Sequence, residues 1–255
     1  MRQHRFLRLC LLLAGLAGAG SGAAQPLPLR GQGGPVAVLE SGLGGDPLPA
    51  WEGLLPWLEP CLTLALHDRA APGGAVPPAE GAVLAADVAE ALRVRLRESG
   101  LPPPYLLVGH SLGGLYIQAF ARANPGLVAG MVLVDAASPL EPPGVFVPTV
   151  PPIPGSREAA EEEGVAASAA AMLAGPPLPP VPLRVLVATD HADTPAREAL
   201  WQEVQRRTAA LSPRGRMVRV ESGHFIQSDR PDAVADSILQ VASEAGLDVS
   251  ACRSR

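Results

Sequence analysis

The chain has 255 residues, of which 47% are hydrophobic and 18% charged, and its mean hydropathy is +0.20. This composition supplies enough apolar side chains for a buried core and excludes a wholly disordered chain. The net charge is −5, and no block of basic residues is present. A nucleic-acid-binding surface, which needs clustered basic residues, is therefore not expected.

The first 24 residues have the three-part layout of a secretory signal. Three arginines precede the short apolar run "LCLLLAGLAGAG", and small residues follow it up to Ala24. We expect cleavage after Ala24, which would place the remaining protein outside the cell or in the periplasm. The run is short for a bilayer span, so no stable membrane span is expected once the signal is removed; a retained anchor is the alternative.

From residue 36 onward, short apolar runs alternate with segments of helical periodicity. Several of the runs are unbroken, as in strands that are buried on both faces of a parallel sheet. The pattern predicts one α/β domain over 25–255, with a mostly parallel sheet and helices on both of its faces. The expected strands are Val36–Glu40, Leu62–His67, Tyr105–Val108, Met131–Val134, Leu183–Ala188 and Met217–Val220, and the expected helices are Val83–Glu98, Leu112–Ala123, Pro195–Leu211 and Pro231–Ala245.

Residues 136–182 interrupt this alternation. They hold 12 of the 29 prolines, on both sides of a helical candidate at Arg157–Leu173. So many prolines exclude a sheet element and predict an insertion, which we interpret as a small lid or cap. Its apolar side chains would either contact substrate or pack in the core: Leu140, Val145, Phe146 and Met172.

The sequence Gly109-His110-Ser111-Leu112-Gly113 fits the pattern G-x-S-x-G, between a predicted strand and a predicted helix. A strand that turns directly into a helix strains the residue at the tip and requires small neighbours, because strand and helix approach closely. The Ser111 hydroxyl would then stand clear of the backbone. The Leu112 amide, at the start of the helix, would face a developing oxyanion.

A nucleophilic serine needs a base, and histidine has a suitable pKa. His4 lies in the signal, His67 lies at a strand end, His110 adjoins the serine, and His191 lies in a loop after a strand. His224 differs, because it falls between the last strand and the last helix, at the sheet edge that also carries Ser111. His224 is therefore the predicted base.

The order Ser…His, with "VGHSLGGLYIQAFARANP" and "SGHFIQSDRP", resembles the α/β-hydrolase fold family and its lipase/esterase-like branch. The resemblance extends from about Val36 to Val241. It implies an α/β-hydrolase fold and a serine hydrolase that cleaves carboxylic esters of small molecules, with no metal or cofactor. Thioester or amide hydrolysis by the same residues, or a binding protein without activity, are the alternatives.

Two further assignments follow from the resemblance. "ESGLGG" resembles the family's His-Gly oxyanion loop, with Ser41 in place of the histidine, which implies the Leu43 amide as the second oxyanion donor. For the triad acid, "VLVDAASP" resembles the branch in which the acid follows the earlier strand, which favours Asp135. Asp193 and Asp190, after the next strand, remain open alternatives.

Two cysteines remain after removal of the signal, Cys61 and Cys252. In an exported protein they could form one disulfide, or they could be a buried thiol and a thiol in the tail. Neither belongs to a tight His/Cys cluster, so a structural zinc is not expected.

Overall fold

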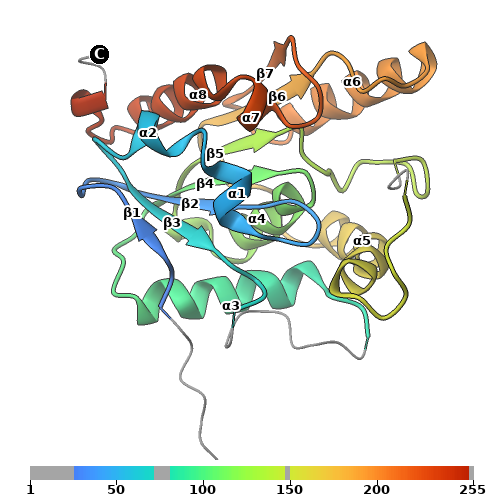
Figure 1. The fold of residues 1–255 in the computed structure, drawn as a ribbon, viewed down its shortest axis with the longest axis horizontal. Helices are drawn as coiled ribbons and strands as arrows, with labels where there is room; N and C mark the ends of the chain where they lie inside the picture. The colour runs from blue at the N-terminus through green and yellow to red at the C-terminus, as the bar shows by residue number, and fades with distance from the viewer. Residues whose placement is uncertain (1–25, 72–80, 147–149, 253–255) are drawn as a thin grey trace, which may run out of the picture.

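The structure, a computed structural model, describes residues 26–71, 81–146 and 150–252. The predicted signal at 1–24 lies outside the described residues. The described chain forms a seven-stranded sheet in the order β1-β3-β2-β4-β5-β6-β7, in which only the β1–β3 pair is antiparallel (Figure 1). The strands are β1 Leu29–Arg30, β2 Val36–Glu40, β3 Thr63–His67, β4 Tyr105–His110, β5 Val128–Val134, β6 Leu183–Ala188 and β7 Gly215–Val220.

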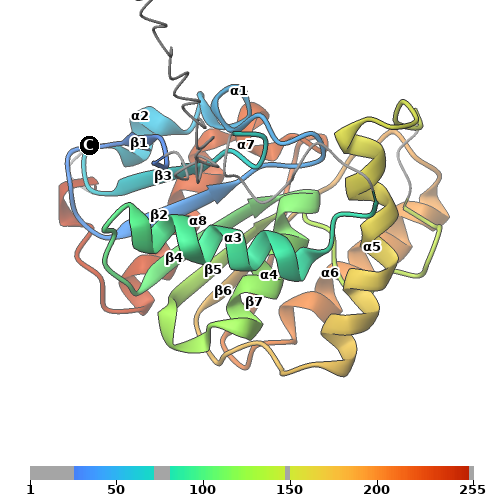
Figure 2. The same ribbon diagram turned by 90° about the horizontal axis from the view of Figure 1, so that it is seen from below.

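Helices cover both faces of this sheet. On each face, side chains of the strands and helices pack together in one hydrophobic cluster. In β4, Tyr105 and Leu107 face the cluster under α3 and α4, whereas Leu106 and Val108 face the cluster under α8. Figures 1 and 2 show α3 and α8 on opposite sides of the strands. The helices are α1 Pro47–Trp51, α2 Leu55–Leu58, α3 Ala85–Glu98, α4 Leu112–Ala123, α5 Arg157–Ala174, α6 Pro195–Ala209, α7 Ile226–Asp229 and α8 Pro231–Glu244.

The predicted fold class is confirmed, and all six predicted strands form. Three strands are longer than predicted: β4 includes Gly109 and His110, β5 begins at Val128, and β7 begins at Gly215. β1 and the short helices α1, α2 and α7 were not predicted, because two to five residues carry too little periodicity to be recognised.

The helix predicted in the Pro-rich segment is α5, and it docks against the start of α3. The Val83 amide donates to the Ala160 carbonyl (2.8 Å), and the Ala85 amide donates to Ser168 Oγ (2.9 Å). Gly164 permits this close approach, because a Cβ there would lie 1.8 Å from the Val83 carbonyl oxygen. Of the two roles left open for Met172, substrate contact or core packing, the structure has core packing.

Cys61 and Cys252 form a disulfide, with a Cα–Cα distance of 5.4 Å. It joins the turn before β3 to the C-terminal turn of the described chain, at the amino edge of the sheet. Of the two cysteine arrangements that the sequence left open, the structure therefore has the paired one. In the described part of the chain, no helix has the length and hydropathy needed to cross a bilayer.

Candidate active site

Ser111 lies at the carboxyl end of β4 and starts α4 in a strained conformation, with φ 51° and ψ −127°. The positions that flank it must be glycine, because a side chain there would collide with neighbouring backbone atoms. A Cβ on Gly109 would lie 2.8 Å from the Gly113 carbonyl oxygen, and a Cβ on Gly113 would lie 2.4 Å from the Glu40 carbonyl oxygen. The steric reason given for the G-x-S-x-G pattern therefore holds in this chain.

The turn at Ser111 is tied to the end of the neighbouring strand β5. The Ser111 amide donates to the Val134 carbonyl (3.2 Å), and the Ala137 amide donates to the Ser111 carbonyl (2.9 Å). Asp135 lies between these two bonded residues and has a positive φ of 42°. The same hydrogen bonds thus fix the serine and Asp135 at one edge of the sheet.

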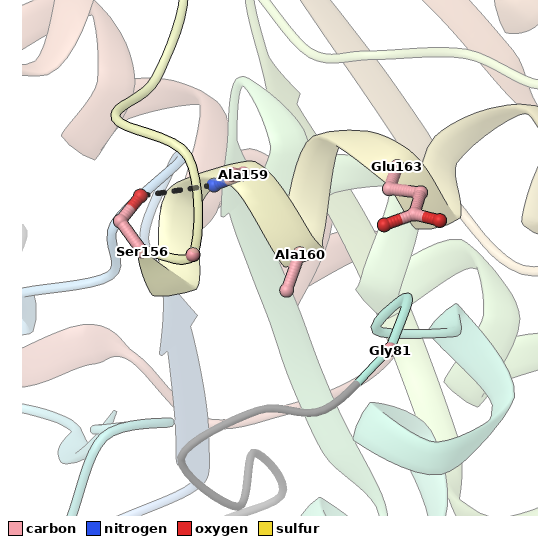
Figure 3. Close-up of a pocket in the computed structure, with 6 residues that line it drawn as sticks. Gly81, Ser156, Ala159, Ala160 and Glu163 are labelled. Carbon is pink, nitrogen blue, oxygen red and sulfur yellow. Dashed lines mark hydrogen bonds between the residues drawn. The ribbon is translucent and has the colours of Figure 1, made fainter.

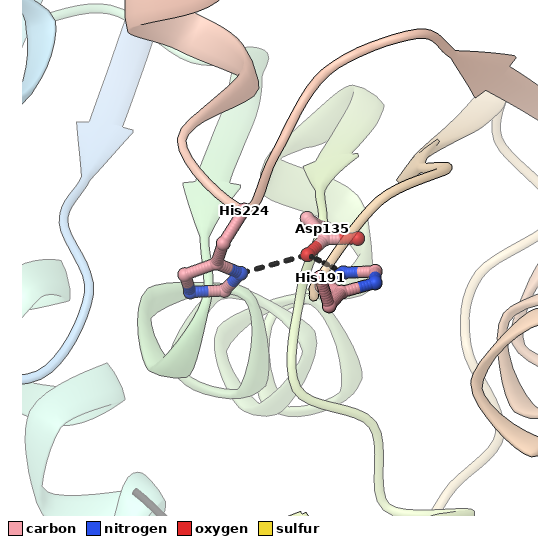
Figure 4. Close-up of side chains that lie close together, drawn as sticks. All are labelled: Asp135, His191 and His224. Atoms are coloured by element: carbon pink, nitrogen blue, oxygen red, sulfur yellow. Dashed lines mark hydrogen bonds and ion pairs between the residues drawn. The ribbon is translucent and has the colours of Figure 1, made fainter. Parts of the chain in front are cut away.

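The structure brings His224 and Asp135 together, 89 residues apart in the chain (Figure 4). His224 Nδ1 lies 2.7 Å from Asp135 Oδ2, and the Asp135 side chain is fully buried. Burial alone would raise the pKa of Asp135, but hydrogen bonds from His191 and His224 outweigh it and hold the pKa well below its ordinary value. Asp135 is therefore a buried carboxylate that orients the His224 ring.

The other carboxylate oxygen of Asp135 is also fully engaged. Oδ1 accepts from the Ala188 amide (3.1 Å) and from Trp201 Nε1 (2.9 Å). Together with the two histidines on Oδ2, four donors hold this carboxylate in place. Such a set of donors stabilises the ionised form.

His191 is the site residue that the sequence reasoning missed. Its Nε2 lies 2.7 Å from Asp135 Oδ2, on the same oxygen that His224 contacts (Figure 4). Its hydrogen bond to Asp135 raises the pKa of His191 to about 9, although burial opposes the shift. The available signal was its place after β6, at the carboxyl edge that also carries Ser111.

Asp190 and Asp193, the alternative acids, make contacts elsewhere. Asp190 accepts from the Ala192 amide (2.9 Å), and Asp193 accepts from the Thr194 amide and pairs with Arg197 at the start of α6. Both side chains lie in the exposed loop after β6. His224 is bonded to Asp135 and to neither of them.

His110, next to the serine, supports the loop that carries His224. Its Nε2 lies 3.1 Å from the His224 carbonyl oxygen, and the two rings are 4.7 Å apart. Burial lowers the pKa of His110 to about 3, so the ring is neutral and donates to that carbonyl. The expectation that His110 shapes the turn agrees with these contacts.

The loop predicted to hold the oxyanion lies against the serine. A Cβ on Gly42 would lie 3.1 Å from Ser111 Cβ. Arg69 donates to the carbonyl oxygens of Ser41 (2.8 Å) and Gly42 (2.6 Å), which fixes the orientation of both peptides. The Leu43 amide donates to no other described residue.

This loop is also bonded to α5 across the fold. The Gly44 amide donates to Glu161 Oε2 (3.0 Å), and Arg69 Nε donates to Glu161 Oε1 (3.0 Å). Glu40 completes the buried cluster, accepting from Arg69 Nη1 (2.6 Å) and contacting His67 Nδ1 (2.5 Å). A side chain of the Pro-rich insertion thus holds the loop beside Ser111.

Two further features concern the Ser111 hydroxyl and a hollow beside α5. Among the described residues, no hydrogen bond joins Ser111 Oγ to the His224 ring; in free enzymes such bonds are often long and tighten only with substrate. A hollow of about 100 Å³ lies at the start of α5, but none of the site residues lines it (Figure 3). Its lining consists of Gly81, Gly155, Ser156, Ala159, Ala160 and Glu163.

Asp135, His191 and His224 also have potential metal-ligand atoms within 4.8 Å of one another. Both imidazole nitrogens lie 2.7 Å from the single oxygen Oδ2, which is an N–H···O hydrogen-bond distance. We therefore interpret the group as a hydrogen-bonded network around one carboxylate.

Comparison with known proteins agrees with this architecture. The model of the family described as "alpha/beta hydrolase fold" matches residues 38–160. One curated protein, "Probable transporter efuK" of Hormonema carpetanum, is 32% identical over 114 residues, which is 44% of this chain and only 16% of that protein.

Solved structures resemble the chain over most of its length. A thermophilic esterase from Thermogutta terrifontis has a TM-score of 0.61 at 22% identity, covering 86% of this chain and 93% of its own. A putative aryl esterase from Burkholderia cenocepacia has a TM-score of 0.61 at 20% identity, covering 86% and 94%. A putative epoxide hydrolase from Pseudomonas aeruginosa has a TM-score of 0.62 at 16% identity, covering 88% and 92%. The chain therefore has the α/β-hydrolase fold.

Proposed function

We propose that this α/β-hydrolase cleaves carboxylic esters of small molecules, with Ser111 as nucleophile, His224 as general base and Asp135 as the acid that orients the base. The observation that carries the proposal is the 2.7 Å contact between His224 Nδ1 and the buried Asp135, at the sheet edge where Ser111 stands on its strained turn. A serine, a base and an oriented carboxylate at one edge are what acyl transfer requires.

In this mechanism, Ser111 Oγ attacks the ester carbonyl carbon while His224 Nε2 takes the hydroxyl proton. The resulting imidazolium is stabilised by Asp135, which also keeps the Nδ1–H tautomer that leaves Nε2 free. His224 then gives the proton to the leaving alcohol, and an acyl group remains on Ser111. Water, activated by the same histidine, releases the acid and restores the serine.

The oxyanion of each tetrahedral intermediate would be held by the amides of Leu112 and Leu43. Leu112 is the first residue of α4, where backbone N–H groups have no partner within the helix. The assignment of Leu43 is supported by its neighbour Gly42, which lies against Ser111. Loss of one such donor typically reduces kcat by about 10²–10³-fold.

We also propose that the protein acts after export, in the periplasm or outside the cell. The signal-like segment at 1–24 and the Cys61–Cys252 disulfide support this placement, because disulfides persist in oxidising compartments.

A fluorophosphonate probe tests the proposed nucleophile. Wild-type protein should be labelled on Ser111, and Ser111→Ala should not be labelled, as read by mass spectrometry of the peptide. Folded wild-type protein that takes no label would contradict an enzymatic function. A screen of esters of increasing acyl length, with a thioester and an anilide of matched acyl group, then measures the substrate class.

A further inference from the structure

His191 lies between two carboxylates, and each of its ring nitrogens faces one of them. Nε2 lies 2.7 Å from Asp135 Oδ2, and Nδ1 lies 2.9 Å from Glu198 Oε2. Glu198 Oε1 also accepts from the His191 amide (2.8 Å), which fixes the carboxylate relative to the ring. We propose that His191 is a positioning residue that bridges Asp135 and Glu198 as a doubly protonated imidazolium.

The charge follows from the hydrogen-bond geometry. A neutral imidazole has one N–H and one lone pair, so one of its nitrogens would direct a lone pair at a carboxylate oxygen. Two ionised carboxylate partners are satisfied only when both nitrogens carry a proton. The pKa of about 9 that the bond to Asp135 gives His191 agrees with this protonation state at neutral pH.

The charged groups near the ring come from several elements. Asp135 reaches it from the end of β5, Glu198 from α6, and His224 from the loop after β7, with the two imidazole rings 6.4 Å apart. Trp201 packs edge-on against the ring at 5.8 Å, and the exposed Asp193 lies in the same loop. Arg197, the nearby cation on α6, is paired with Asp193. Beyond these groups, burial and the Asp135 charge raise the pKa of Glu141, in the segment after β5, to about 7.

A row of α6 side chains holds this loop and the segment after β5 together. Their positions, 198, 201, 202 and 205, follow the i, i+3, i+4, i+7 pattern of one helical face. Trp201 bonds the Asp135 carboxylate, Gln202 Nε2 donates to the Ala188 carbonyl (2.9 Å), and Gln205 Nε2 donates to the Ala136 carbonyl (2.8 Å). Glu198 is the first member of the row, and through it α6 also fixes the His191 ring.

The effect of the His191 charge on catalysis rests on the proposed function. Asp135 stabilises a positive charge on His224 during catalysis, whereas a second cation on the same carboxylate oxygen disfavours it. His191 thus holds Asp135 in place and opposes a second positive charge beside the same carboxylate oxygen. At a ring separation of 6.4 Å, removing one unit charge should move the acidic limb of kcat/KM upward by about one pH unit.

The protonation state can be measured without any substrate. Long-range ¹H–¹⁵N correlation spectra of the full chain in the presence of a chelator, with the five histidines assigned by single substitutions, report the protons on each ring nitrogen. At pH 7.5 both nitrogens of His191 should be protonated. In Glu198→Gln, which removes one carboxylate, His191 should lose a proton at lower pH than in the wild type.

Kinetics supply the second readout. His191→Gln keeps a side-chain donor for Asp135 but removes the charge, so its acidic limb of kcat/KM should shift upward. His191→Lys, which restores a cation, should move the limb back. Glu203→Gln is the matched control, because Glu203 lies on α6 in an exposed pair with Arg206 and should change neither readout.

The two measurements distinguish failure of the inferred His191 bridge from failure of the proposed function. A singly protonated His191 ring in the wild type, as expected if Glu198 carried the proton, would overturn the inferred bridge. A uniform loss of activity in His191→Gln at all pH values would assign His191 a purely structural role. If the protein hydrolyses no ester, the proposed function fails, but the ring spectra still decide the protonation of His191.

Discussion

At the scale of single residues, Asp135 is the point at which the hydrogen bonds of the site converge. It is fully buried, yet it accepts from two histidine rings, one indole and one backbone amide. A buried carboxylate is stable only with such partners, and it then orients whatever donates to it. The acid role that we propose for Asp135 therefore depends on this local environment more than on the residue type.

Replacing Asp135 with Asn should test that role. The amide cannot stabilise the His224 imidazolium and favours the wrong tautomer, so kcat should fall by about 10⁴-fold. Asp193→Asn, which removes an exposed carboxylate paired with Arg197, should leave kcat near the wild-type value. Ester hydrolysis measured on both folded variants decides the question, and equal losses would contradict the assignment.

Only some residues of the candidate site could be predicted from the sequence. Ser111 and His224 stand out because a motif and a position after the last strand mark them individually. The acid could not be chosen among three aspartates, because the contact between Asp135 and His224 joins residues 89 apart. His191 was missed for the same reason, since its partner Asp135 is 56 residues away.

At the scale of elements, α5 is hydrogen-bonded to the loop that lies beside Ser111. Its buried Glu161 bonds both Arg69 and the Gly44 amide, so the helix fixes the loop that lies beside Ser111. The loop carbonyls of Ser41 and Gly42 are held by the same arginine. Displacement of α5 would therefore disturb the proposed oxyanion site directly.

Glu161→Gln should weaken this connection. The amide keeps one acceptor but loses the charge that opposes the buried Arg69, so the free energy of unfolding should fall by about 1–3 kcal/mol. The kcat for ester hydrolysis should fall as well, because the Gly44 peptide loses its fixed partner. Urea denaturation and steady-state kinetics measure the two effects.

The control for this substitution lies on the same helix. Glu163 is exposed, and Glu163→Gln removes the same charge without touching Arg69. It should change neither the unfolding free energy nor kcat. Equal stabilities of the Glu161 and Glu163 variants would show that α5 does not hold the loop.

At the scale of the whole molecule, the disulfide joins the turn before β3 to the C-terminal end of the described chain. Cys61 and Cys252 are separated by 191 residues, and they lie at the amino edge of the sheet, opposite the carboxyl edge that carries the site. The bridge constrains the unfolded chain across most of the domain length. The disulfide should therefore raise the free energy of unfolding and leave the catalytic rate unchanged.

The double variant Cys61→Ala/Cys252→Ala tests whether the disulfide affects stability but not catalysis. Loss of a disulfide that closes so long a loop should lower the free energy of unfolding by about 2–5 kcal/mol, as measured by urea denaturation. The kcat of the folded variant should remain close to the wild-type value at low temperature. A loss of activity without loss of folded protein would contradict this expectation.

The sequence by itself determined the strand–helix alternation, the strained turn at Ser111 and the histidine after the last strand. These features are local, because buried strands are unbroken apolar runs and close backbone approach requires glycine at fixed offsets. The tertiary structure alone decided the partner of His224, the contacts of His191 and the bond from Glu161 to the Gly44 amide. Each of these joins segments far apart in the chain, and only the packing of α5, α6 and the parallel strands brings them together.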